Sequence, residues 1–205
     1  MTRTAGDTIR TSLARPAGDA ATAARRFAER ASAEGLIDVA YATYESPVGT
    51  GTVAATKRGV VAIGLPNRPV EDVLDELAHG ISPRVLELPG RLDDARRELD
   101  EYFAGARREF DLPLDWRLVG PGFGSRVLRA TAKLPFGITS TYAQIAAAAG
   151  NPRAYRAAGS ALGRNPIPLI VPCHRVLLSG GKIGHYGGGP ELKEYLLRLE
   201  GAIGN

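Results

Sequence analysis

The chain has 205 residues, of which 44% are hydrophobic and 23% are charged, and its formal net charge is +4. This length can bury a sizeable core in one or two small domains. A single cysteine excludes an internal disulfide and a thiolate metal cluster, and three scattered histidines predict no metal site. No apolar run approaches membrane-spanning length, so we expect a soluble, cytoplasmic protein.

Residues 1–36 are predicted to be an N-terminal extension. They are rich in Ala, Arg and Thr and carry six arginines and four acidic residues. We expect residues 1–18 to be disordered and residues 20–33 to form a short helix, because apolar side chains recur there at helical spacing. The apolar stripe of that helix would consist of Ala24, Phe27 and Ala31.

Residues 37–115 are predicted to be a small antiparallel sheet with helices. Three β-prone runs are separated by turn residues, and two later segments carry apolar residues at helical spacing. The region is acidic, with nine Lys/Arg against fifteen Asp/Glu. The predicted strands cover residues 39–44, 51–56 and 60–65, and the predicted helices cover 69–78 and 92–103.

Residues 116–205 have the opposite charge balance. They carry eleven Lys/Arg against three Asp/Glu, and no acidic residue lies between Trp116 and Pro190. Scattered charge usually means a solvated surface, but so long a stretch without a carboxylate creates a field that attracts a polyanion. Because Lys and Arg contacts to phosphates supply most non-specific affinity for DNA, we expect this region to bind double-stranded DNA.

Two adjacent helices in this region predict a helix-turn-helix. Thr141 and Gln144 have capping-box spacing, so one helix should begin at Thr141. Asn151 is a favourable N-cap and Pro152 a favourable first residue for the next helix. The predicted helices of the region cover residues 126–134, 141–149, 152–163 and 190–200.

The helix predicted over residues 152–163 has a basic face with few bulky side chains. An ordinary Ala-rich helix with a solvated face is the alternative interpretation. A helix that reads bases would carry Asn, Gln or several Arg directed at base edges, so this one is expected to approach a duplex closely without reading its sequence. One stripe consists of Ala154, Ala157, Ala158 and Ala161, and the basic stripe consists of Arg153, Arg156 and Ser160.

The only cysteine of the chain, Cys173, is followed directly by His174. An apolar run precedes this pair and a polar, glycine-containing segment follows it, which is a favourable setting for a nucleophile. A thiolate needs a nearby base or positive charge, because a free thiol has a pKa of about 8.5. A small buried apolar residue is the alternative interpretation of a lone cysteine.

The region around this pair resembles the active site of the O6-alkylguanine-DNA alkyltransferases, also called methylated-DNA–protein-cysteine methyltransferases. The resemblance is strong over residues 123–201 and weaker over 39–65. It implies an α+β fold, with a small RNase H-like N-terminal antiparallel sheet with helices and a winged-helix-like C-terminal helical domain with a helix-turn-helix. The matching segments are Asn165-Pro166-Ile167-Pro168, Pro172-Cys173-His174-Arg175-Val176 and Gly184-His185-Tyr186-Gly187-Gly188-Gly189.

The resemblance implies direct transfer of the alkyl group from O6 of guanine in DNA to Cys173, once per molecule and without a cofactor or metal. His174 would take the thiol proton, through a water molecule, and Glu200 would hold the imidazole. Tyr142 would donate a hydrogen bond to guanine N3, and Asn165 would brace the turn beside the site. Activity on O4-alkylthymine, the preferred alkyl size and cooperative assembly on DNA are left open, and we expect a monomer in solution.

The resemblance also implies how DNA binds. The helix that carries Arg156 would lie in the minor groove, and Arg156 would fill the gap left by a flipped nucleotide, whose extrusion costs a few kcal/mol. The backbone carbonyls of Cys173 and Val176 would accept hydrogen bonds from the guanine amino group, and Tyr186 and the backbone of Gly187 would close over the base. The other residues expected on the DNA face are Arg153, Ala157 and Ser160.

Three residues depart from the family pattern. Gly187 replaces the serine of some members, and little is lost because only its backbone N–H is needed. Tyr155 replaces a small residue and would pack internally or contact the DNA backbone, while His185 would touch substrate, DNA or neither.

Three other functions are alternatives to alkyl transfer. A module that only marks lesions carries tryptophan in place of the cysteine, so Cys173 argues against it. A Cys–His hydrolase would need a separate histidine partner and an oxyanion motif, and the sequence shows neither. A regulator that used the helix-turn-helix alone would leave the cysteine motif unexplained.

Overall fold

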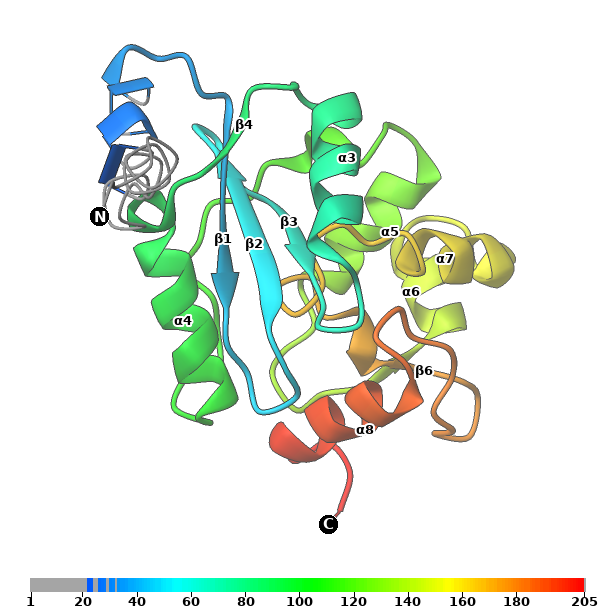
Figure 1. Cartoon of the computed structure of the whole chain (residues 1–205). Coiled ribbons are helices and arrows are strands. Elements are labelled where there is room, and N and C mark those ends of the chain that lie inside the picture. The colour runs from blue at the N-terminus through cyan, green and yellow to red at the C-terminus, as the bar shows by residue number, and fades with distance from the viewer. Residues whose placement is uncertain (1–21, 24–25, 29, 32, 205) are drawn as a thin grey trace, which may run out of the picture. The chain divides into compact units, whose positions relative to one another are not determined.

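The computed structural model describes residues 22–23, 26–28, 30–31 and 33–204 (Figure 1). From Asp38 onward the chain forms one compact unit, and the segment before it belongs to a second. The elements of the larger unit follow in the order β1 (Val39–Tyr44), β2 (Gly51–Thr56), β3 (Gly59–Gly64), α3 (Val70–Gly80), β4 (Val85–Glu87), η1 (Pro89–Arg91), α4 (Asp93–Phe103), η2 (Trp116–Leu118), α5 (Phe123–Thr131), β5 (Ser140–Thr141), α6 (Tyr142–Ala148), α7 (Tyr155–Leu162), η3 (Cys173–Arg175), β6 (Val176–Leu177) and α8 (Pro190–Leu199).

The described residues between 22 and 33 are helical, as the sequence predicted. The predicted apolar stripe is wrong at Phe27, which is exposed, whereas Ala28 and Ala31 are buried. Ala24 and the segment 1–18, for which disorder was expected, lie outside the described residues.

The sheet of the larger unit has the strand order β3-β2-β1-β4. The three predicted strands are confirmed as an antiparallel meander, in which Tyr41 of β1 pairs with Ala54 of β2. A fourth strand, β4, pairs with β1 in parallel and was not predicted. With three residues, β4 is too short to produce a readable alternation of apolar and polar side chains.

Helices α3 and α4 cover opposite faces of this sheet. Successive side chains of a strand point to opposite faces, so the contacts of individual β1 residues show which helix covers which face. Val39 lies in the cluster that includes Val73 and Leu77 of α3, all three of which are fully buried. Tyr44, on the other face of β1, stacks on Phe103 of α4 with ring centroids 6.3 Å apart. Both helices were predicted from apolar spacing, and both are confirmed.

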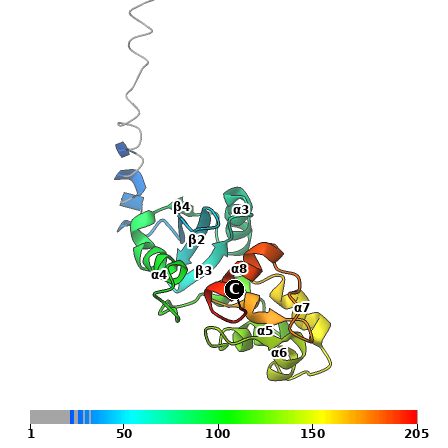
Figure 2. The same cartoon turned by 90° about the horizontal axis from the view of Figure 1, so that it is seen from below.

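Helices α5, α6 and α7 pack against one another and lie to one side of the sheet in both ribbon views (Figures 1 and 2). Helix α5 begins at Phe123, three residues earlier than predicted. The predicted capping box at the start of α6 is present, since Thr141 Oγ1 accepts from the Gln144 N–H and Gln144 Oε1 accepts from the Thr141 N–H. No helix in the described ranges is both long and apolar enough to cross a membrane.

The predicted start of the second helix of the helix-turn-helix is wrong. Asn151 O accepts a hydrogen bond from the Ala154 N–H at 3.0 Å, so this segment forms a turn, and α7 begins only at Tyr155. Proline disfavours a helical conformation in the residue before it, so Asn-Pro suits a turn as well as a helix start. Arg153 therefore lies in the turn, and the buried face of α7 consists of Ala158, Ala161 and Leu162.

Candidate active site

Cys173 begins the short helix η3 and is only 8% exposed. The backbone before it bends in two tight turns. The first is centred on the buried Leu169, whose φ of 72° makes it the one non-glycine residue with positive φ in the described part of the chain. The second is centred on Pro172 and lets the Cys173 N–H donate to Val171 O at 2.8 Å. A positive φ costs a non-glycine residue about 1–3 kcal/mol, so the surrounding packing must hold this path.

The Asn165 side chain ties this turn to the sulfur. Its Nδ2 donates to Val171 O at 2.8 Å and to Cys173 Sγ at 3.1 Å. Its Oδ1 accepts from the Ile167 N–H at 3.1 Å. One amide therefore fixes both the loop and the position of the thiol.

The thiol and the imidazole beside it are both held in their neutral forms. Burial raises the pKa of the Cys173 thiol, although the Asn165 hydrogen bond and the nearby Lys193 act in the opposite direction. Burial also lowers the pKa of His174, against the effect of Glu200. Cys173 is therefore protonated at neutral pH and needs a base, and a neutral imidazole follows it in the chain.

Glu200, the residue that caps the C-terminus of α8, accepts hydrogen bonds from four residues. Its Oε1 accepts from His174 Nε2 at 2.8 Å, from Arg175 Nη2 at 2.9 Å and from the Tyr102 hydroxyl at 2.7 Å. Its Oε2 accepts from Arg175 Nε at 2.8 Å and from the Gly137 N–H at 3.2 Å. Burial opposes the charge on Glu200, but the hydrogen bonds from His174 and Arg175 hold its pKa well below the usual range.

This network fixes the tautomer of His174. An ionised carboxylate only accepts hydrogen bonds, so Nε2 carries the imidazole proton and Nδ1 keeps a free lone pair. Nδ1 is buried and has no hydrogen-bond partner among the residues that the structure describes. The imidazole is therefore oriented through Nε2 by Glu200, and its Nδ1 lone pair is not used by any described residue.

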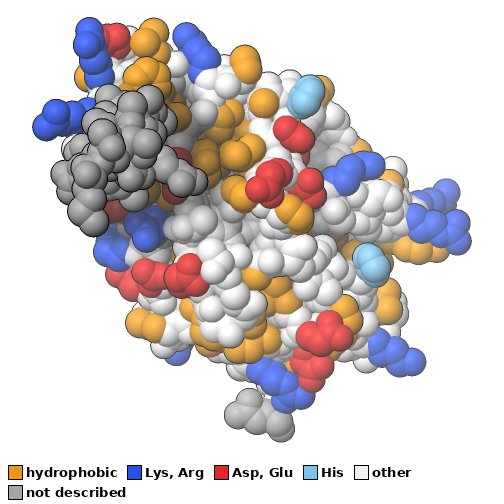
Figure 3. All heavy atoms as spheres, in the orientation of Figure 1, with side chains coloured by type: hydrophobic (Ala, Val, Ile, Leu, Met, Phe, Trp, Pro, Cys, Tyr) orange, Lys and Arg blue, Asp and Glu red, His pale blue; other side chains and the backbone are white. Residues whose placement is uncertain are grey.

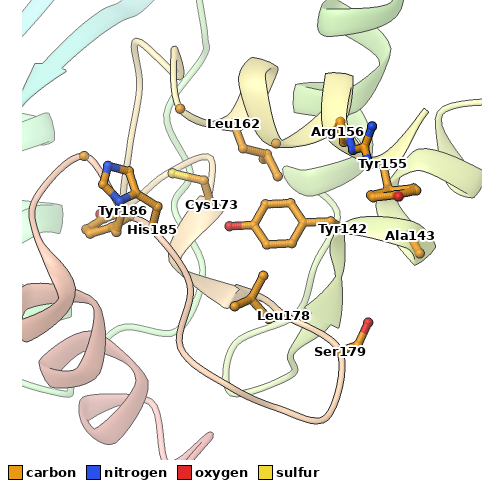
Figure 4. Close-up of a pocket in the computed structure, with 13 residues that line it drawn as sticks. Tyr142, Ala143, Tyr155, Arg156, Leu162, Cys173, Leu178, Ser179, His185 and Tyr186 are labelled. Atoms are coloured by element: carbon orange, nitrogen blue, oxygen red, sulfur yellow. The ribbon is translucent and has the colours of Figure 1, made fainter. Parts of the chain in front are cut away.

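A pocket of about 670 Å³ opens at Cys173. In Figure 4, the ring of Tyr142 lies between Cys173 and Tyr155, and its hydroxyl points toward the Cys173 side. Burial raises the pKa of Tyr142, so its hydroxyl remains a donor at neutral pH. Of the predicted site residues, this pocket brings together Tyr142, Arg156, Cys173, Tyr186 and Gly187.

The predicted DNA-facing residues are exposed together beside this pocket. Arg156 both faces solvent and lines the pocket, and Figure 3 shows Lys and Arg side chains without acidic neighbours over the α7 end of the molecule. Tyr155 is 48% exposed with the Arg156 guanidinium 5.7 Å from its ring centroid, so it does not pack in the interior. The other exposed residues of the predicted face are Arg153, Ala157 and Ser160.

The loop after β6 contributes both His185 and Tyr186 to the lining of the pocket. His185 is exposed and lines the pocket beside Cys173 (Figure 4). Tyr186 is buried, and its ring lies edge-on to His174 with centroids 6.3 Å apart. Its hydroxyl has no hydrogen-bond partner within the described ranges.

Three buried residues with polar groups at the site, Tyr102, Arg175 and Lys193, were not predicted to have a role. Lys193 donates to Val176 O at 2.6 Å, so this carbonyl, expected to accept from guanine, already has one donor and keeps one lone pair. Burial lowers the pKa of Lys193 to about 8. Its helical spacing with Leu196 and Leu197 could have placed Lys193 on the buried face of α8, but nothing in the sequence links Tyr102 to Glu200. The described residues contain no cluster of three or more metal ligands.

Comparison with known proteins gives two family-model matches that together span the larger unit. The ribonuclease-like domain of 6-O-methylguanine DNA methyltransferase matches residues 39–116, and the DNA-binding domain of the same family matches residues 122–202. The methylated-DNA–protein-cysteine methyltransferase of Methanosarcina acetivorans is 38% identical over 163 residues, covering 79% of this chain and 98% of that protein. The one of Mycobacterium tuberculosis is 42% identical over 160 residues, covering 78% and 91%.

Solved structures agree with these matches. The crystal structure of Mycobacterium tuberculosis OGT in complex with DNA has a TM-score of 0.68 at 38% identity and covers 78% of this chain and 92% of that one. The O6-methylguanine-DNA methyltransferase of Pyrococcus kodakaraensis has a TM-score of 0.60 at 26% identity and covers 80% and 99%. The predicted fold class is thus confirmed.

Proposed function

Because this chain belongs to the methylated-DNA–protein-cysteine methyltransferase family, we propose that it repairs DNA by moving an alkyl group from O6 of guanine to Cys173. The arrangement of Cys173, His174 and Glu200 beside an open pocket is the observation that carries this proposal. Relatives are named for transfer of a methyl group from methylated DNA to a protein cysteine, and Mycobacterium tuberculosis OGT has been solved in complex with DNA.

The transfer begins with removal of the thiol proton. His174 Nδ1 accepts it, through a bridging water, and Glu200 stabilises the imidazolium that results. The Asn165 donor beside Sγ stabilises the growing thiolate charge. The lone pair on sulfur then attacks the alkyl carbon in line with the bond to O6.

The bond between sulfur and carbon forms as the bond between carbon and O6 breaks. The electron pair of the broken bond stays on guanine, and the proton that left Cys173 finally neutralises the base. The hydroxyl of Tyr142, donating to N3, stabilises the negative charge as it develops. Cys173 is left as a thioether, which nothing in this sequence of steps removes, so each molecule acts once.

The substrate base must leave the duplex to reach Cys173, which is only 8% exposed. We place the exposed face of α7 in the minor groove, with Arg156 filling the gap in the base stack. Extruding a base costs a few kcal/mol, and a damaged, poorly paired base costs least. The backbone of Gly187 and the ring of Tyr186 close over the base, and O4-alkylthymine is a second candidate substrate.

Intact-protein mass measurement tests the proposal directly. After incubation with a duplex that contains O6-methylguanine, we expect one added methyl group, on Cys173, in an amount that never exceeds one per protein. A Cys173→Ser variant should remain unmodified while still binding the duplex. Unmodified wild-type protein that binds the lesion tightly would favour a lesion-marking role, and turnover beyond one equivalent would exclude the single-use mechanism.

A further inference from the structure

The loop between β6 and α8 borders the pocket and contains the glycines Gly187 and Gly188. Glycine backbone is conformationally permissive, so such a loop needs external contacts to hold one shape. Within it, the Gly189 N–H donates to Tyr186 O. The carbonyl of Gly187 instead accepts from a side chain 120 residues away, Asn67 Nδ2, at 2.9 Å.

Asn67 is presented to this loop by a tight turn that follows β3. The turn is closed by the Arg68 N–H, which donates to Leu65 O at 2.9 Å. Pro66 occupies its second position, where the fixed φ of proline is favoured, and Asn67 occupies the third. Asn67 is exposed, so its side chain can be changed without opening the core.

Two neighbours of Asn67 contact the site as well. Gly188 lies close to Leu65, since a Cβ at Gly188 would be 3.0 Å from Leu65 Cδ1. The Ile63 N–H donates to Pro166 O at 2.8 Å, beside the turn that precedes Cys173. Residues 63, 65 and 67 therefore contact both the segment that leads to the cysteine turn and the glycine loop.

We propose that Asn67 is a positioning residue for alkyl transfer, resting on the function proposed above. Its amide fixes the Gly187 peptide, so that the backbone of the loop meets the base in one orientation rather than many. A single neutral hydrogen bond is worth about 0.5–1.5 kcal/mol, so its loss should slow the chemical step about threefold to tenfold.

The Asn67→Ala variant tests this proposal in single-turnover assays. We expect the maximal rate of Cys173 alkylation to fall about threefold to tenfold, with the half-saturating duplex concentration changed less than twofold. Free O6-benzylguanine should show the same slowing, because the loop acts on the base and not on the duplex. Hydrogen exchange of the peptide covering residues 182–189 should become faster.

Further variants separate positioning from general stability. Asn67→Gln keeps a donor and should recover part of the rate, whereas Asn67→Asp keeps the size without the donor and should not. Ser82→Ala is the matched control, since it removes a 2.6 Å side-chain hydrogen bond to Asp38 elsewhere in the same region. The three Asn67 variants should melt within about 2 °C of wild type, because changes at an exposed residue alter the free energy of unfolding by no more than about 0.5 kcal/mol.

Two results would overturn the role of Asn67. One is an unchanged rate and unchanged exchange in Asn67→Ala, and the other is equal slowing in Ser82→Ala. If wild-type protein transfers no alkyl group, the proposed function fails on its own. The exchange of residues 182–189 still decides whether Asn67 holds the loop.

Discussion

The two sides of Cys173 differ in how their polar groups are satisfied. On one side, Glu200 is buried and accepts hydrogen bonds from His174, Arg175, Tyr102 and Gly137. On the other side, the pocket is lined largely by apolar and aromatic surface and opens toward α7. In the proposed transfer, the groups that would move the proton are fixed before substrate arrives, while the groups that would meet the base are left open to it.

This difference predicts two kinds of mutational effect. A buried ionic network is costly to desolvate and stabilises the fold only while every partner is present. Changes on the Glu200 side should therefore reduce both the free energy of unfolding and the rate of transfer. Changes on the pocket side should reduce the rate alone.

The largest effect is expected for Glu200→Gln. This change leaves the buried guanidinium of Arg175 without its carboxylate, so we expect a loss of about 3–5 kcal/mol in the free energy of unfolding. Transfer should slow by about 10²-fold or more, because His174 loses the group that orients it and stabilises its charge. Urea denaturation and single-turnover alkylation measure the two effects, and a stable variant would contradict the contrast between the two sides.

The pH dependence of stability gives a second test on the same side. The pKa of Glu200 is lower in the folded chain than its ordinary value of 4.5, so its contribution is present above about pH 4.5 and is lost as the pH falls. Burial likewise lowers the pKa of His174 from 6.5, so the unfolded chain takes up its proton first on acidification. The free energy of unfolding should fall from about pH 6.5 downward, and the gap between wild type and Glu200→Gln should narrow below pH 4.5. A gap that stays constant down to pH 3 would argue against this linkage.

Tyr102→Phe should have a smaller effect of the same kind. It removes one donor to an ionised carboxylate, a bond worth about 1.5–3 kcal/mol, while keeping the ring, which lies edge-on to the ring of Phe136. Thermal and urea unfolding would measure the loss. Binding of duplex DNA should be unchanged, and weakened binding would mean that the Glu200 side also shapes the pocket.

Arg156→Ala tests the pocket side and should leave the free energy of unfolding within about 0.5 kcal/mol of wild type. Transfer from O6-methylguanine in duplex DNA should slow on the order of tenfold, because the extruded base no longer has its gap filled. Transfer from free O6-benzylguanine should change less than twofold. Equal slowing with both substrates would refute the flipping role.

Much of this site was predictable because its residues lie in short motifs. Asn165, Cys173 and His174 fall within ten residues of one another, and the family resemblance of this short segment was enough to imply their roles. Glu200 depended on the resemblance entirely, since a glutamate at a helix end is usually solvated. Its surroundings were beyond prediction because the donor Tyr102 comes from 98 residues away.

The fold could be predicted where a local sequence pattern fits only one kind of structure. It could not be predicted where the same pattern fits two. The capping box at Thr141 has reciprocal side-chain bonds that only a helix start satisfies, and it is confirmed. Asn151 and Pro152 suit both a helix start and a turn, and the chain forms the turn. Asn67 carries no sequence signal of its role, because its partner Gly187 lies far along the chain.

The contacts made by Ile63, Asn67 and Tyr102 all cross the predicted domain boundary between residues 115 and 116. If residues 39–115 unfolded alone, Glu200 would lose a donor and the carbonyls of Pro166 and Gly187 would lose theirs. Such losses couple the two regions in free energy, so the chain from residue 38 onward should melt in a single cooperative transition. The second region, produced by itself, would then be a less stable protein than its length suggests.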